Sequence, residues 1–100
     1  MPPKGVKKRY LCEFEVVTQL TPQNSVKVKS LTVACPPGKT VIGGAARTFG
    51  AIANVALSAS GPEGPPNAPT SWFAVATEVG PGPGADWGLR VDVFCAVVEP

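Results

Sequence analysis

The chain has 100 residues, 44% hydrophobic and 16% charged, which excludes a second domain and indicates one globular domain. The net charge of +2 is uneven, because four of the nine basic residues lie in the first nine positions and the rest of the chain is slightly acidic. Twelve prolines and eleven glycines argue against long helices. No window approaches the roughly 18 consecutive apolar residues of a membrane span, and the basic start contains no apolar signal core, so we expect no membrane contact and no Sec export.

The first nine residues contain prolines and basic residues without an apolar period. They predict an extended basic arm (residues 1–9) in front of a single β domain (residues 10–100). Four charges beside an acidic body are a weak signal for nucleic acid, and contact with a neighbouring protein subunit explains them equally well, so we expect no specific nucleic-acid partner. The residues expected to bind that subunit are Lys4, Val6, Lys7, Lys8, Arg9, Tyr10 and Leu11.

Alternating apolar residues predict the strands of the first half of the chain. In the first strand, the alternation predicts an inward face made of Tyr10, Cys12, Phe14 and Val16, with Glu13 and Glu15 on the solvated outer face. In the next, the apolar set moves from Val26 and Val28 to Leu31, Val33 and Cys35, which predicts a bulge or break between Lys29 and Leu31. After a turn at residues 35–39, a third strand is expected over residues 40–49.

The second half repeats this pattern. Residues 51–60 are expected to form a strand because Ile52 and Val55 favour β structure. Residues 61–69 contain four prolines, which cannot donate the hydrogen bonds of a β-ladder, so this segment is expected to form a loop. A strand over residues 71–79 should turn Phe73 and Val75 inward. The longest alternation begins at Trp87 and is typical of a strand in the middle of a sheet. These segments predict an all-β fold, an antiparallel β-sandwich or small barrel of about six strands.

Few residues offer catalytic or metal-binding chemistry. The chain contains no histidine, which removes the commonest general base and zinc ligand. Glu13 and Glu15 are interpreted as solvated charges, and Asp92 beside Arg90 suggests an ion pair worth little. The segment Gly38-Lys39-Thr40 resembles the end of a P-loop, but Val33 stands where the first glycine is needed and a strand follows. We therefore expect no catalytic residues, no metal, no cofactor and no enzyme.

Three cysteines without a C-x-x-C spacing leave two interpretations open. Cys35 and Cys95 could face each other across strands and form a disulfide, with Cys12 left as a buried thiol. All three could equally be reduced and serve as small apolar core residues, since nothing in the sequence directs export to an oxidising compartment.

Trp72, Phe73, Trp87 and Phe94 could form an aromatic platform for a glycan or single-stranded nucleic acid. Core packing explains them better, because all four lie on alternating strands. Trp87, at the start of its strand, is the ring expected to reach the surface, and Trp72 is the other candidate for ligand binding.

Three segments resemble a small β module that recurs in bacteria and phages. They are C-P-P-G-K-T-V-I-G-G at residues 35–44, W-F-A-V-A at residues 72–76, and a closing F-C-A strand at residues 94–96, within a resemblance covering roughly residues 26–98. In that family the two outer cysteines are commonly paired, which implies a bond between Cys35 and Cys95. Members occur in exported surface proteins and in virion proteins, and none is known to us as an enzyme.

The resemblance, combined with the expected lack of an export signal, favours the virion members. It implies a structural protein of a bacteriophage, similar to a tailed-phage capsid decoration (cement) protein on the capsid surface. Its partners would be the major capsid protein and further copies of itself in a trimer or another symmetric oligomer. The alternative function is a glycan or cell-surface binding module of a phage tail or an exported, extracellular protein.

Overall fold

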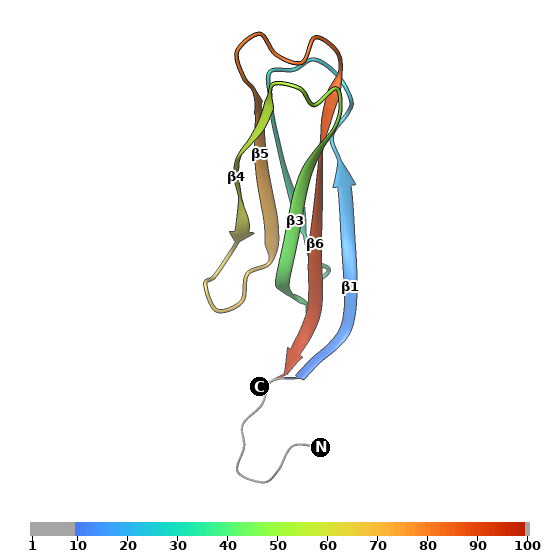
Figure 1. Ribbon diagram of the computed structural model, residues 1–100. Coiled ribbons are helices and arrows are strands. Elements are labelled where there is room, and N and C mark those ends of the chain that lie inside the picture. Colours follow the sequence, from blue (N-terminus) through green and yellow to red (C-terminus); the bar gives the residue numbers. More distant parts are fainter. Residues whose placement is uncertain (1–9, 100) are drawn as a thin grey trace.

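Six antiparallel strands form two facing layers (Figure 1). The computed structural model describes residues 10–99, and in this range it contains strands and no helix. The strands are β1 (Tyr10–Leu20), β2 (Val28–Ala34), β3 (Thr40–Gly50), β4 (Val55–Glu63), β5 (Ser71–Glu78) and β6 (Trp87–Glu99). Sheet A has the order β1-β6-β3 and sheet B the order β2-β5-β4. The expected all-β fold of about six antiparallel strands is confirmed, and of the two expected architectures its two facing sheets are consistent with the sandwich.

β6 is the central strand of sheet A and supplies most of the core. Its alternating residues from Trp87 to Cys95 are fully buried, as a long period of two predicts for a strand paired on both sides. Sheet B contributes Val33 from β2 and two alanines, Ala74 and Ala76, from β5. These small side chains leave room for the bulky residues of β6 at close packing. Phe73 and Val75, expected to point inward, lie on the opposite face of β5 and are only partly buried.

β1 faces the opposite way from the sequence expectation. Its pairing with β6 shifts register between Cys12 and Glu15, and Glu13 has a positive φ of 53°. A bulge of this kind inserts one extra residue and exchanges the two faces of the strand that follows. Glu15 and Val17 therefore point toward the other sheet, whereas Phe14 and Val16 point outward and are exposed.

β2 does not contain the expected bulge. It pairs with β5 without interruption, from Val28 opposite Thr77 to Ala34 opposite Ser71. The alternation is preserved because Lys29, only 6% exposed, occupies an inward position, although the sequence pattern placed it on the polar face opposite Val28. A lysine can do this, since its aliphatic stem packs like an apolar chain while its ammonium reaches polar partners. The exposed residue Val28 consequently faces solvent.

β4 extends into the segment expected to be a loop. It begins at Val55 and continues through Gly61 to Glu63, with Pro62 opposite Trp72 of β5. β4 is an edge strand, so the missing N–H of a proline can face away from the ladder. The prediction of a loop is therefore wrong for residues 61–63. No helix that could span a membrane occurs in the described part of the chain.

Candidate functional site

The outward surface of sheet A, named here the outer face, is the most distinctive surface of the molecule. The register places on it alternate residues of the three strands, namely Phe14, Val16, Thr18 and Leu20 of β1, Gly88, Arg90, Asp92 and Phe94 of β6, and Gly43, Ala45, Arg47 and Phe49 of β3. Apolar side chains occupy its ends, and charged and polar side chains occupy its centre.

One end of the outer face is an exposed apolar patch. Phe14 is 61% exposed and Val16 47%, although both are large hydrophobic residues on a strand. The ring centroids of Phe14 and Phe94 lie 6.4 Å apart, a tilted arrangement that aromatic pairs favour. Phe94 packs over the backbone of Gly43, where an added Cβ would lie 3.1 Å from its ring. The result is a solvent-exposed apolar surface in which the Phe94 ring is held by its contacts.

The centre of the outer face is ionic. The Asp92 carboxylate accepts hydrogen bonds from the Thr18 hydroxyl and from Arg90 Nε, the latter at 3.1 Å, which confirms the expected ion pair. Burial by itself would raise the pKa of Asp92, but the two hydrogen bonds and the charges of Arg90 and Arg47 together hold this pKa below its ordinary value. Asp92 is therefore an anion that accepts a hydrogen bond from Thr18 of β1 and is paired with Arg90 of its own strand. Arg47 of β3 adds a favourable charge to this centre.

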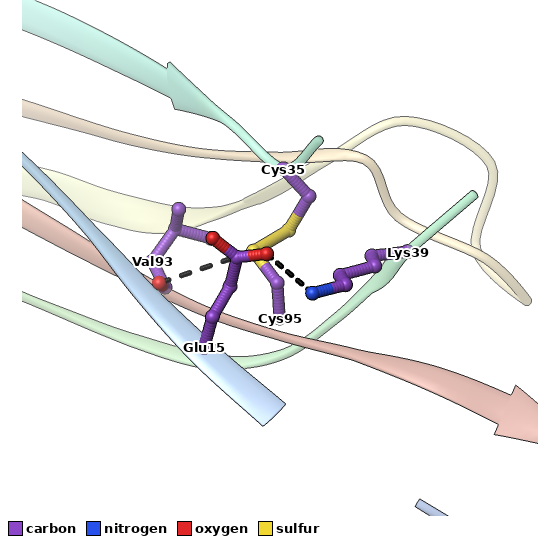
Figure 2. Close-up of a disulfide and its surroundings, with 5 residues drawn as sticks. All are labelled: Glu15, Cys35, Lys39, Val93 and Cys95. Carbon is purple, nitrogen blue, oxygen red and sulfur yellow. Dashed lines mark hydrogen bonds and ion pairs between the residues drawn. A yellow bond between two sulfur atoms is a disulfide. The ribbon is translucent and has the colours of Figure 1, made fainter. Parts of the chain in front are cut away.

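A disulfide joins the two sheets on the inward face of β6, opposite the outer face (Figure 2). Cys35, just after β2, is bonded to Cys95 of β6, with Cα atoms 5.8 Å apart. This is the pair that the family resemblance implies. Glu15 lies opposite Cys95 in the ladder, and its carboxylate forms an ion pair with the Lys39 ammonium. Lys39, the middle residue of the false P-loop, thus has a structural partner, and a strand follows it. The Cys12 side chain lies outside the described residues.

Lys29 and Trp87 form a buried polar cluster at the far end of the sandwich. The Lys29 ammonium lies 5.0 Å from the centroid of the Trp87 ring and donates to Pro22 O and to Asn24 Oδ1. The Trp87 indole N–H donates to Glu78 Oε2 at 2.9 Å. Every polar group of this cluster has a partner of its own, so the cluster holds the end of the core together.

The two tryptophans do not form an exposed platform. Trp87, expected to reach the surface, is fully buried, because its strand begins inside the sandwich and the chain around Asn24 pairs with it. Trp72 is partly buried, packs over Gly44 of β3 and donates its indole N–H to Ser60 Oγ at 2.9 Å. Both rings support packing between strands.

Of the residues expected to bind a partner, most lie outside the described part of the chain. Residues 1–9, which include Lys4, Val6, Lys7, Lys8 and Arg9, are not described. The backbones of Tyr10 and Leu11 belong to β1 and pair with Glu99 and Val98, so these two residues are part of sheet A rather than of the arm.

The apolar patch on the outer face was missed by sequence analysis. The alternation showed that Phe14 and Val16 share a face, but both faces of this strand carry apolar residues, and the bulge that decides which face is buried has no clear sequence signal. The described residues contain no group of three or more histidine, cysteine or acidic residues that could hold a metal ion. No family model, no curated protein and no solved structure matches this chain.

Proposed function

We propose that this chain is a non-enzymatic structural protein that binds other protein subunits through the outer face of sheet A. The observation that carries the proposal is the exposed apolar patch around Phe14 and Phe94, next to a fixed ionic centre. Contiguous exposed apolar surface with polar groups at its border is typical of a protein interface. Arg47 and Arg90 face each other on the same face, one step beyond Asp92 from the patch, and offer charged contacts that would orient a partner.

The partner we propose is a tailed-phage capsid. The support is the resemblance of residues 35–44, 72–76 and 94–96 to virion modules. As a decoration (cement) protein on the capsid surface, the chain would stabilise the shell by burying area across boundaries between major capsid protein subunits. It would act as a trimer or another symmetric oligomer, because a repeated capsid position presents a symmetric target.

The alternative, a glycan or cell-surface binding module, has less support. Such a module needs exposed aromatic rings on which a sugar can stack. Trp87 is fully buried, and the Trp72 ring packs against Gly44, so neither tryptophan offers such a ring.

Saturable co-sedimentation with purified shells assembled from tailed-phage capsid proteins tests the proposal. Arg47→Glu reverses a charge on the outer face, and Lys27→Glu reverses the same charge on an exposed residue just before β2, outside this face. We expect wild type and Lys27→Glu to bind alike and Arg47→Glu to bind at least about tenfold more weakly, a loss of about 1.4 kcal/mol. Equal binding by both variants, or no binding of the wild type, would contradict the proposal.

A further inference from the structure

We propose that two copies of this chain join through the free edge of β1, so that their A sheets form one continuous six-stranded sheet. The two β1 strands would run antiparallel across a two-fold axis that passes beside Val17. This inference rests on the proposed function, in which the chain acts by binding protein subunits, and identifies a second copy as one of those subunits.

β1 is an edge strand with little protection. Within residues 10–99 it pairs only with β6, and from Glu13 to Leu20 every residue except Glu15 and Val17 is exposed. Edge strands that stay single usually carry prolines, lysines or unpaired charges. The edge strands β1 and β4 both have a register shift, but β4 also has Pro62. In β1 the shift lies before Glu15, and residues 15–20 contain no proline and no lysine. Their one charge, Glu15, is neutralised by Lys39.

The hydrogen-bonding groups of this edge can be assigned. Thr21 N donates to Leu89 O at 2.9 Å, and antiparallel pairs alternate between bonded and non-bonded residues. The odd-numbered residues from Glu15 to Thr21 therefore bond to β6. The even-numbered ones, Phe14, Val16, Thr18 and Leu20, direct their backbone N–H and C=O groups away from β6 toward the free edge.

A register centred on Val17 fits these groups and side chains and gives the longest overlap of the two strands. The regular part of β1, after the bulge, covers residues 14–20, and its centre is Val17. A two-fold axis at Val17 places Phe14 opposite Leu20 of the second copy and Val16 opposite Thr18, which pairs bonding residues with bonding residues. It also sets Glu15 opposite Gln19 and Glu13 opposite Thr21, so no two carboxylates face each other. An axis at Glu15 would place the two Glu15 side chains opposite each other, which is destabilising.

The surroundings of β1 leave room for a second strand. Among the described residues of the facing sheet, β2 contacts β6 more than it contacts β1, and β4 contacts only β3 of sheet A, so sheet B is displaced toward the β3 side of sheet A. Figure 1 shows β1 standing at the side of the molecule away from β4 and β5. In the pair, each Phe14 gains an apolar neighbour in Leu20, which is 57% exposed in the single chain. Each apolar patch is thereby extended by Leu20 of the second copy.

Light scattering of the purified chain alone measures the association, independently of any shell. We expect twice the mass of one chain. Phe14→Lys and Leu20→Glu should each shift the mass toward that of one chain at a given concentration. The double variant should restore the dimer, because the register places each introduced lysine opposite the introduced glutamate of the second copy. Val28→Glu, which changes an exposed apolar residue of sheet B, is the matched control and should remain dimeric.

Cross-linking tests the register directly. Facing residues of a non-bonded antiparallel pair have Cα atoms about 4.5 Å apart, within the range that a disulfide spans. In a chain carrying Cys12→Ala, Val17→Cys should therefore form a covalent dimer under mild oxidation, whereas Ser30→Cys on β2 should not. A wild-type mass of one chain or of three chains, or equal cross-linking at both positions, would overturn the inference. Failure of shell binding with an intact dimer would contradict the proposed function and leave this inference standing.

Discussion

Gly44 allows Trp72 to lie directly on the backbone of β3. A Cβ added at Gly44 would come within 2.2 Å of the Trp72 ring, and the ring is held in place by its hydrogen bond to Ser60. Gly61, which like Gly44 lies in a strand with no positive φ, would place a Cβ 3.8 Å from Phe73, an ordinary contact. The two glycines therefore differ in the space around them rather than in their backbone conformation.

We predict that Gly44→Ala destabilises the protein by about 1–3 kcal/mol, because overpacking forces the Trp72 ring or β3 to move. Urea unfolding followed by tryptophan fluorescence measures this difference. Gly61→Ala is the control and should change the free energy of unfolding by no more than about 0.5 kcal/mol. A Gly44→Ala variant as stable as wild type would show that the ring can move without cost.

The Asp92 carboxylate makes the stability of the folded chain depend on pH. Its pKa in the folded chain lies below its ordinary value of 3.8, so the unfolded chain binds more protons in acid. The carboxylate therefore contributes stability that is fully present above the unfolded-state pKa and is lost as the pH falls through the folded-state pKa. We predict that the melting temperature of Asp92→Asn falls less steeply than that of wild type between about pH 4 and about pH 2. Asp86→Asn, which changes an exposed carboxylate, should follow the wild-type curve, and an equal flattening by both variants would argue against a specific role of Asp92.

At the scale of elements, the presence of the strands could be predicted from the sequence, whereas the buried face of β1 and the extent of β4 could not. The period of two located β6 and β5, and β3 was predicted over residues 40–49, after the turn at residues 35–39. The buried face of β1 was predicted wrongly, because it depends on a bulge at Glu13 set by pairing with β6. The path of β4 through Pro62 was missed because a proline is excluded from a central strand but tolerated at an edge, and the sequence does not tell which strand is an edge.

The candidate site was predictable only in part, for the same reason. The Arg90–Asp92 pair follows from two charges on one face of a strand, and it is present. The exposed position of Phe14 and the buried position of Trp87 depend on which face of each strand meets the other sheet, and this is decided by contacts between distant segments. Alternation identifies two faces without identifying the buried one.

Lys29 shows how β2 completes the core with a charged residue. Its stem is buried between the sheets, and its ammonium lies near the Trp87 ring and bonds to Pro22 O and Asn24. We predict that Lys29→Met, which keeps most of the stem, lowers the free energy of unfolding by about 1 kcal/mol, the order of a lost hydrogen bond. Lys29→Ala, which also removes the stem, should lower it by about 2–4 kcal/mol.

Urea unfolding of both variants separates packing from hydrogen bonding at this position. Lys27, exposed and two residues earlier, is the control, and Lys27→Met and Lys27→Ala should each remain within about 0.5 kcal/mol of wild type. Equal losses for Lys29→Met and Lys29→Ala would mean that the ammonium, rather than the stem, accounts for the contribution of this side chain.

At the scale of the whole molecule, the two sheets are held together by a thin core and one covalent link. Several inward positions are alanine or glycine, so each contributes little buried area. The disulfide connects the end of β2 in sheet B with the central strand of sheet A, over a sequence separation of 60 residues. Small domains with limited cores commonly depend on such a link.

We predict that removing this disulfide costs about 4 kcal/mol, the loop-closure entropy of a loop of this length. The change is Cys35→Ala combined with Cys95→Ala, and the measurement is the urea midpoint of unfolding with and without reductant. Reductant should lower the midpoint of wild type toward that of the double variant and leave the double variant unchanged. Cys12→Ala is the control, and its midpoint should keep the full sensitivity to reductant, since the link between Cys35 and Cys95 remains. A wild-type midpoint that does not respond to reductant, together with a double variant of unchanged stability, would mean that the apolar contacts of Val33, Leu89 and Val91 hold the two sheets together without the covalent link.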